Sequence, residues 1–128
     1  MYRPITYVLI LTLLGGCGGP LLWFAGGKLD GLEQPWSAAA VPPESLVIQL
    51  ETRPEEPYSV NVNGIVIDAA LYVDPAPERS WYQYMAQDAR VRVKWNDTVY
   101  AALAVPVSDP EVLANFEADR KVLVFTPR

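Results

Sequence analysis

The sequence of 128 residues contains no histidine and a single cysteine, Cys17. The absence of histidine excludes His-based catalytic triads and imidazole general bases, and it removes the ligand on which most catalytic zinc sites depend. One cysteine excludes a disulfide within the chain. The carboxylates show no spacing typical of an acid–base pair or a metal site, so a hydrolase or metal enzyme is not expected.

Charged residues are also few, at 20% of the chain, and basic residues are the minority among them. Ten Lys and Arg are scattered among fifteen Asp and Glu, which gives a net charge of −5. Nucleic acid is therefore not an expected partner, because binding to phosphates requires a concentrated basic surface. Hydrophobic residues make up 51% of the chain, which predicts one folded body rather than a disordered one.

No charge occurs between Arg3 and Lys28, and residues 5–14 form an almost continuous apolar run. The run has the length of the hydrophobic region of a signal peptide. The LGGC sequence that ends at Cys17 resembles the lipobox of bacterial lipoproteins. That resemblance implies that residues 1–16 are a signal peptide and that the thiol of Cys17 carries lipid after cleavage.

An uncleaved membrane anchor is the alternative interpretation of the N-terminus. Residues 5–27 are long enough to span a bilayer, which requires about 20 apolar residues. The glycines around Cys17, together with Pro20, disfavour a continuous helix there. An internal core helix is the third alternative. Either anchor predicts a protein of the bacterial cell envelope whose folded body faces the periplasm or the exterior, although Arg3 and Lys28 provide little charge asymmetry.

Residues 17–44 are rich in Gly and Pro, which predicts a linker or a loosely wrapped arm. Trp23, Phe24 and Trp36 are too apolar for a free tether. We expect them to pack on the wall of the folded body or to lie at the lipid interface.

From Ser45 onward the hydrophobic period is two, which predicts strands. The strands expected are 46–51, 58–62, 70–73, 90–95, 98–107 and 121–126. Because they follow one another at hairpin distance, residues 45–128 are expected to form a mainly β fold, a six-stranded antiparallel split β-barrel with two short helices, preceded by the apolar signal or anchor helix.

Two alternatives remain for the first long turn. Asn63-Gly64 is the strongest short hairpin signal, so the sequence by itself favours a turn there. Alternatively, the strand continues through Ile67 with Gly64 as a bulge and turns at Asp68-Ala69.

The two helices have different start signals. Residues 80–88 show helical spacing of aromatic residues, and Ser80 with Gln83 fits a capping box. The second helix is expected to begin at Asp109-Pro110-Glu111, which supplies a cap, a proline at the first position and an acid in the first turn.

The body resembles the flavin- and deazaflavin-binding split β-barrels, the superfamily of pyridoxamine-phosphate-oxidase-like and F420-dependent reductase-like proteins. Three stretches carry the resemblance: residues 47–62, 78–95 and 107–111. Ala89 departs from the family, in which proline is usual at that step. The resemblance implies a turn at Asp68, an FMN or F420 cofactor, and a homodimer with cofactor sites between subunits.

The candidate cofactor residues are cationic and polar side chains. Arg79 is the first candidate to bind a phosphate, since Ser80 and free amides at a helix start also favour an anion, and Arg53 is the second. Each of the two arginines has a solvated surface charge as its alternative.

Ser59, Asn61 and Asn63 form a polar stripe that could bind a ring edge or ribityl chain, or else be the wet face of a strand. Trp81, with Tyr82 and Tyr84, could stack on the isoalloxazine ring, or pack in the core, as its helical spacing favours.

The charged stripe Arg90, Arg92 and Lys94 could meet anionic lipid headgroups or a partner, or else be the solvated face of a strand, which is the usual case.

Two hypotheses of function follow. In the first, a membrane-anchored split barrel binds a flavin or F420-type cofactor and acts as a reductase, with the chemistry supplied by the cofactor. In the second, a cofactor-free envelope lipoprotein uses the barrel as a binding or scaffolding module. No protein partner can be named from the sequence.

Overall fold

The structure, a computed structural model, describes residues 18–128. The predicted signal or anchor helix and the lipidation site Cys17 lie outside the described residues. Within residues 18–128, no helix is both long and apolar enough to cross a membrane.

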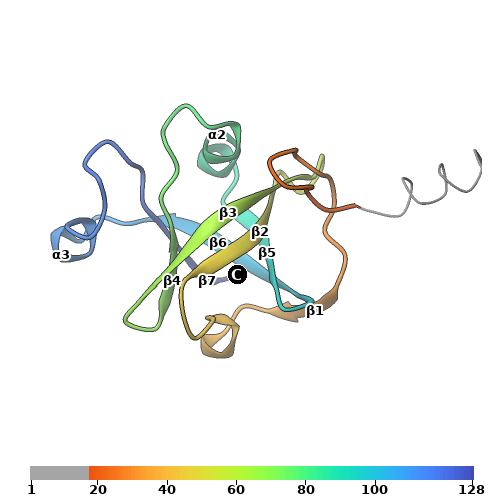
Figure 1. Cartoon of the computed structure of the whole chain (residues 1–128), viewed down its shortest axis with the longest axis horizontal. Helices are drawn as coiled ribbons and strands as arrows, with labels where there is room; N and C mark the ends of the chain where they lie inside the picture. The colour runs from red at the N-terminus through yellow and green to blue at the C-terminus, as the bar shows by residue number, and fades with distance from the viewer. Residues whose placement is uncertain (1–17) are drawn as a thin grey trace, which may run out of the picture.

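Six antiparallel strands, β2 to β7, close into a barrel (Figure 1). Their order around the wall is β6-β5-β2-β3-β4-β7, and β7 pairs with β6 to close it. The strands are β2 (Leu46–Thr52), β3 (Tyr58–Ile67), β4 (Ala70–Val73), β5 (Arg90–Trp95), β6 (Thr98–Pro106) and β7 (Leu123–Pro127). The predicted six-stranded antiparallel barrel is confirmed.

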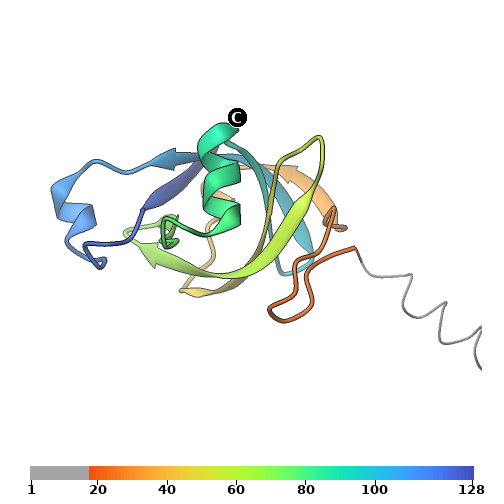
Figure 2. The same cartoon turned by 90° about the horizontal axis from the view of Figure 1, so that it is seen from above.

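The helices lie outside this barrel. They are η1 (Ala38–Ala40), α2 (Ser80–Gln87) and α3 (Pro110–Leu113). Figure 2 shows α2 lying across one side of the barrel and α3 at the end of a loop that projects from it. The predicted pair of short α-helices is confirmed.

Alternating side chains of each strand fill the barrel, as expected for a period of two. Ile48 and Leu50 of β2 and Val91 and Val93 of β5 are at most 1% exposed. The core also contains Trp36, whose ring centroid lies 5.6 Å from that of Phe125 in β7. Trp36 therefore packs in the core.

The first long turn is at Asp68-Ala69, as the family resemblance implied. β3 continues through Asn63 and Gly64, which lie opposite Val47 and Leu46 of β2, and the turn residues Asp68 and Ala69 have φ of 47° and 62°. The prediction from Asn63-Gly64 alone is wrong.

Gly64 is explained by packing instead. A Cβ at this position would lie 3.0 Å from Cδ1 of Leu71 and 3.2 Å from Cγ2 of Ile48. Glycine at this position of the extended strand therefore leaves space for the side chains of Leu71 and Ile48.

The two α-helices begin differently. Asp109 caps α3 as predicted, since its side chain accepts a 2.9 Å hydrogen bond from the amide of Glu111. The predicted capping box of α2 is wrong: Arg79 is the N-cap residue, and no side-chain cap bond is made. Ser80 lies one position inside the helix, where its hydroxyl is not placed as an N-cap side chain.

The segment predicted as a linker arm contains a seventh strand, β1 (Leu32–Pro35). β1 pairs in parallel with β6, from Leu32 opposite Thr98 to Pro35 opposite Ala101. β7 pairs with the remainder of β6, beginning with Pro127 opposite Ala102. β1 and β7 thus follow each other along the same edge of β6.

Candidate functional site

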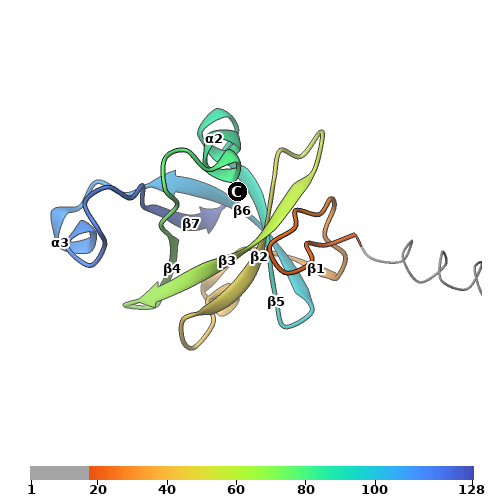
Figure 3. The same ribbon diagram turned by 45° about the horizontal axis from the view of Figure 1, so that its top comes forward.

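Residues 18–35, which we call the N-terminal arm, lie along the outer wall of the barrel near β2, β3 and β5 (Figure 3). Gly26 and Ser59 exchange two backbone hydrogen bonds of 2.8 and 2.9 Å. Nδ2 of Asn61 donates a 2.7 Å hydrogen bond to the carbonyl oxygen of Leu22. The arm is therefore fixed to the polar face of β3.

An ion pair under the arm, which we call the latch, joins β2, β5 and the arm. Nη1 of Arg92 lies 2.8 Å from Oε1 of Glu51, and the two side chains are only 13% and 4% exposed. Oε1 of Glu51 also accepts a 2.7 Å bond from the amide of Leu29, whose carbonyl oxygen accepts a 3.1 Å bond from Arg92. Leu29 is therefore held through both of its backbone polar groups.

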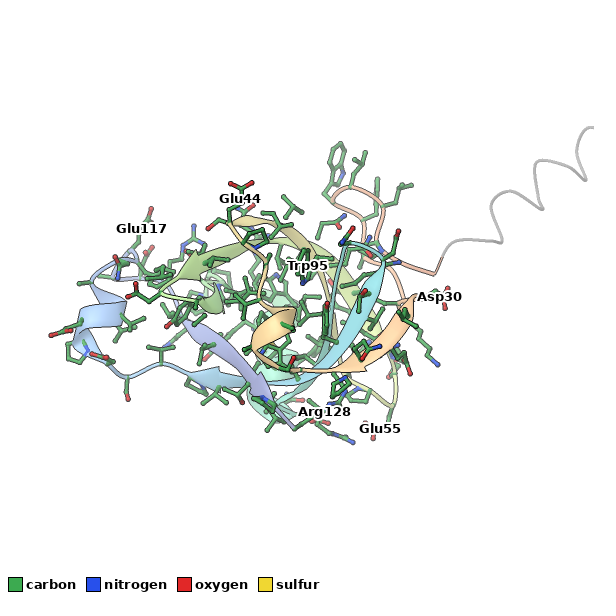
Figure 4. The ribbon with its side chains drawn as sticks, turned by 90° about the horizontal axis from the view of Figure 1, so that it is seen from below. Asp30, Glu44, Glu55, Trp95, Glu117 and Arg128 are labelled. Carbon is green, nitrogen blue, oxygen red and sulfur yellow. The ribbon has the colours of Figure 1, made fainter. Side chains whose placement is uncertain are left out.

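Two further contacts strengthen the attachment of the arm to β5. Arg92 pairs with Glu33 of β1, and Nζ of Lys94 donates to the carbonyl oxygen of Asp30. Figure 4 shows Asp30 at the edge of the molecule where the arm passes. The prediction that the Arg90, Arg92 and Lys94 stripe is a solvated face is wrong for Arg92 and Lys94, because the arm covers them.

Ser59, Asn61 and Asn63 do share the outward face of β3, as predicted. Ser59 is completely buried, and its hydroxyl oxygen has no hydrogen-bond partner among residues 18–128. Asn61 is engaged by Leu22, and only Asn63 is exposed. The arm therefore lies over two thirds of the predicted ligand-binding stripe.

Arg53 holds the β2–β3 loop against α2. Its guanidinium carbon lies 4.2 Å from the centroid of the Tyr84 ring and 5.8 Å from that of Tyr58. Its Nε donates a 2.9 Å hydrogen bond to the carbonyl oxygen of Glu56. The cationic group is thus already stacked and bonded within the fold.

Arg79 and Ser80 are exposed at the start of α2, and none of the ion pairs of residues 18–128 involves Arg79. Trp81 is half-buried against the core, as its helical spacing favoured. Arg53 stacks on Tyr84, five residues beyond Arg79, or about 7.5 Å along a helix that rises 1.5 Å per residue. Arg53 thus contacts the second half of α2, whereas Arg79 lies at its start.

Two shallow cavities flank the Glu33–Arg92 pair. The first, about 360 Å³, is lined by Glu33, Gln34, Pro35, Arg92, Val99, Ala101 and Arg128. The second, about 270 Å³, is lined by Lys28, Glu33, Glu51, Pro54, Pro57 and Arg92. None of the predicted cofactor residues lines either cavity. Residues 18–128 also contain no cluster of three or more side chains that could hold a metal ion.

Sequence reasoning missed Glu33 and Arg92 as parts of this region. The one available signal was the pairing of strands: Glu51 and Arg92 lie directly opposite each other on β2 and β5. Opposite charges at facing positions attract. Recognising that pairing required the register of two strands that are not neighbours in the sequence.

A second charged group joins α2, β5 and the β2–β3 loop. Nη2 of Arg90 lies 2.6 Å from Oδ2 of Asp88 and 3.0 Å from Oε1 of Glu55. The side-chain hydrogen bond from Arg90 lowers the pKa of Asp88 from 3.8 to about 2. The pKa of Arg90 is raised by the same hydrogen bond. The three side chains lie at the surface and are paired with one another, so the cluster links these elements and each of its charges has a partner.

Comparison with known proteins supports the fold. The sequence matches no protein-family model and no curated protein. A crystal structure described as "Putative Pyridoxamine 5'-phosphate oxidase" from Listeria innocua is similar, with a TM-score of 0.54 and 14% sequence identity. The similarity covers 64% of this chain and 83% of that chain. The chain thus has a split β-barrel fold like that of a pyridoxamine-phosphate-oxidase-like protein.

The residues predicted to bind a flavin lie on separate elements, and several of them already make contacts within the chain. A flavin phosphate requires converging cationic and amide donors. Arg53 is stacked on Tyr84, the arm covers Ser59 and Asn61, and Trp81 packs on the core. The exposed members of the set are Asn63 of β3 and, at the start of α2, Arg79 and Ser80.

Proposed function

We propose that the chain is a membrane-tethered split-barrel module of the bacterial cell envelope that binds or scaffolds a partner without a flavin cofactor. The tether is inferred from the apolar residues 5–14 and the lipobox-like sequence ending at Cys17. In this proposal the barrel faces the periplasm or exterior and remains attached through lipid on Cys17.

One observation carries the cofactor-free part of the proposal: the outer wall is closed by the protein's own N-terminal arm. The latch of Glu51, Arg92 and Leu29 is buried, and its donors and acceptors are satisfied within the chain. A ligand that used this polar wall would have to displace those bonds, and an unpaired buried charge is costly.

The surface available to a partner is the side of β1. All four residues of β1 are exposed, and β6 is the strand that pairs with it in the described part of the chain. The adjoining cavity of about 360 Å³ is within the range of about 300 to 1,000 Å³ typical of ligand sites. An extended polypeptide segment suits such a site, because it can pair with the open strand edge and place a side chain in the cavity.

A flavin- or F420-dependent reductase is the second candidate. It is favoured by the split-barrel fold and by the exposed Arg79 and Ser80 at the first turn of α2, where free amides favour an anion. In that case Arg79 would bind the phosphate, and the cofactor would supply the redox chemistry.

The visible spectrum of the purified full-length protein, recorded before and after addition of FMN or F420, distinguishes the two candidates. The proposal predicts a colourless protein that binds neither compound at high micromolar concentration. Binding that is lost on Arg79→Gln substitution would support the reductase and refute the cofactor-free module. Lys121→Gln is the matched control, because it removes an exposed positive charge outside α2.

A further inference from the structure

Near its start the N-terminal arm makes an exposed apolar turn, residues 21–24, which we call the apolar tip. Four consecutive large hydrophobic side chains are exposed there: Leu21 by 65%, Leu22 by 64%, Trp23 by 81% and Phe24 by 61%. The loop that carries these residues projects beyond the barrel (Figure 4). Scattered exposed hydrophobic residues are common, but a contiguous group marks an interaction surface.

The tip has a defined shape. Leu21 and Phe24 exchange two backbone hydrogen bonds of 3.1 and 2.9 Å, and Leu22 adopts a positive φ of 55°. Below the turn, Asn61 binds the carbonyl oxygen of Leu22, and Gly26 pairs with Ser59. The hydrophobic side chains are therefore held away from the barrel by contacts at their base.

We propose that the apolar tip inserts into the interfacial layer of a lipid bilayer and provides a second membrane contact besides the N-terminal anchor. This inference rests on the membrane tether of the proposed function. Leu21 follows Cys17 by four residues, which span at most about 14 Å at 3.3 to 3.6 Å per residue. A lipid on Cys17 would thus keep the tip within reach of the bilayer surface.

The geometry of the tip favours a bilayer over a second copy of the protein. The rings of Trp23 and Phe24 lie side by side, with centroids 5.8 Å apart, and all four side chains of the tip are more than 60% exposed. The interfacial layer of a membrane can cover all four at once, and that layer is where Trp and other amphipathic aromatic rings are enriched.

The test uses the membrane-anchored protein as purified from bacterial membranes, reconstituted in phosphatidylcholine vesicles with and without bromine atoms on the acyl chains. Flotation of the vesicles reports the tether, and quenching of tryptophan fluorescence by the brominated lipid reports insertion of the tip. Trp23→Phe should reduce the quenching by about three-fold or more, because the quencher must approach the ring within the interfacial layer. Trp81→Phe is the matched control and should leave most of the quenching, since Trp81 packs on the core in α2, which lies apart from the arm (Figures 1 and 2).

The remaining outcomes are separable. A chain that floats with equal quenching in the wild type and Trp23→Phe overturns the inference and leaves the tether intact. If Trp23 fluorescence is protected from aqueous acrylamide but is not quenched by the brominated lipid, another protein surface covers the tip. That result also overturns the inference. A chain that does not float refutes the tether and, with it, the inference. Binding of FMN in the spectral test would refute the cofactor-free module without affecting insertion of the tip.

Discussion

Replacing Glu51 with alanine should destabilise the fold by about 3 kcal/mol. Removing one partner of a buried ion pair costs about 3 to 5 kcal/mol, because the remaining charge stays buried without compensation. The lower value applies here, since Arg92 keeps Glu33 and the carbonyl oxygen of Leu29 as partners. For a domain of roughly 100 residues, where 1 kcal/mol shifts Tm by about 4 °C, the expected decrease is about 12 °C.

Urea unfolding of the full chain in mild detergent, followed by tryptophan fluorescence, measures this change in the free energy of unfolding. Hydrogen exchange at the amide of Leu29 gives a local measurement, because that N–H donates to Oε1 of Glu51. The substitution should remove most of the exchange protection at the amide of Leu29. Amides in the middle of β5 should still exchange only through global unfolding.

Glu55→Ala is the matched control, since Glu55 also pairs with an arginine but its side chain is 75% exposed. An exposed pair contributes about 1 kcal/mol or less. The reasoning is refuted if Glu51→Ala destabilises the protein no more than Glu55→Ala and leaves exchange at Leu29 unchanged. That result would show that the arm is not fastened by the latch.

Three other substitutions test separate features. Ala69→Gly should stabilise the protein by about 1 kcal/mol in urea unfolding, since Ala69 has a φ of 62° and left-handed backbone costs about 1 to 2 kcal/mol in a non-glycine residue. Gly64→Ala should destabilise it by about 1 to 3 kcal/mol in the same assay, because the added Cβ would lie 3.0 Å from Cδ1 of Leu71. Asp88 has a folded pKa of about 2, below its ordinary value of 3.8, so its contribution to stability is present above pH 3.8 and is lost as the pH falls through about 2. Asp88→Asn, which changes the carboxylate that accepts from Arg90, should therefore weaken the pH dependence of stability between those values, as measured by acid titration of unfolding.

The barrel could be predicted because its strands are encoded locally. Alternation of hydrophobic and polar residues identifies a strand within a few residues, and the Asn96-Asp97 turn has the positive φ values of 52° and 61° expected for a hairpin. The Asn63-Gly64 prediction failed because the same local signal was overruled by pairing with β2. Neighbours such as Leu71, which need the space at Gly64, are distant in the sequence until the sheet forms.

The candidate site was predictable only in part, for the same reason. The sequence correctly placed Ser59, Asn61 and Asn63 on one face of β3, and it favoured packing of Trp81 on the core. It could not reveal that the arm covers that face. The covering depends on contacts such as Asn61 with Leu22, which are 39 residues apart.

The latch also constrains the order in which the chain can assemble. The two bonds that hold Leu29 come from Glu51 and Arg92, which are 22 and 63 residues further along the chain. During synthesis the arm emerges first, yet its docking surface does not exist until β2 and β5 have paired. Since contacts of such long sequence separation form late, docking of the arm should be among the final steps of folding.

In the membrane-tethered protein proposed above, residues 18–35 would until that step be an undocked segment between the membrane and the growing barrel. Formation of the latch would then shorten this segment and bring the folded body closer to its tether. The orientation of the barrel relative to the membrane would thus depend on the completion of folding.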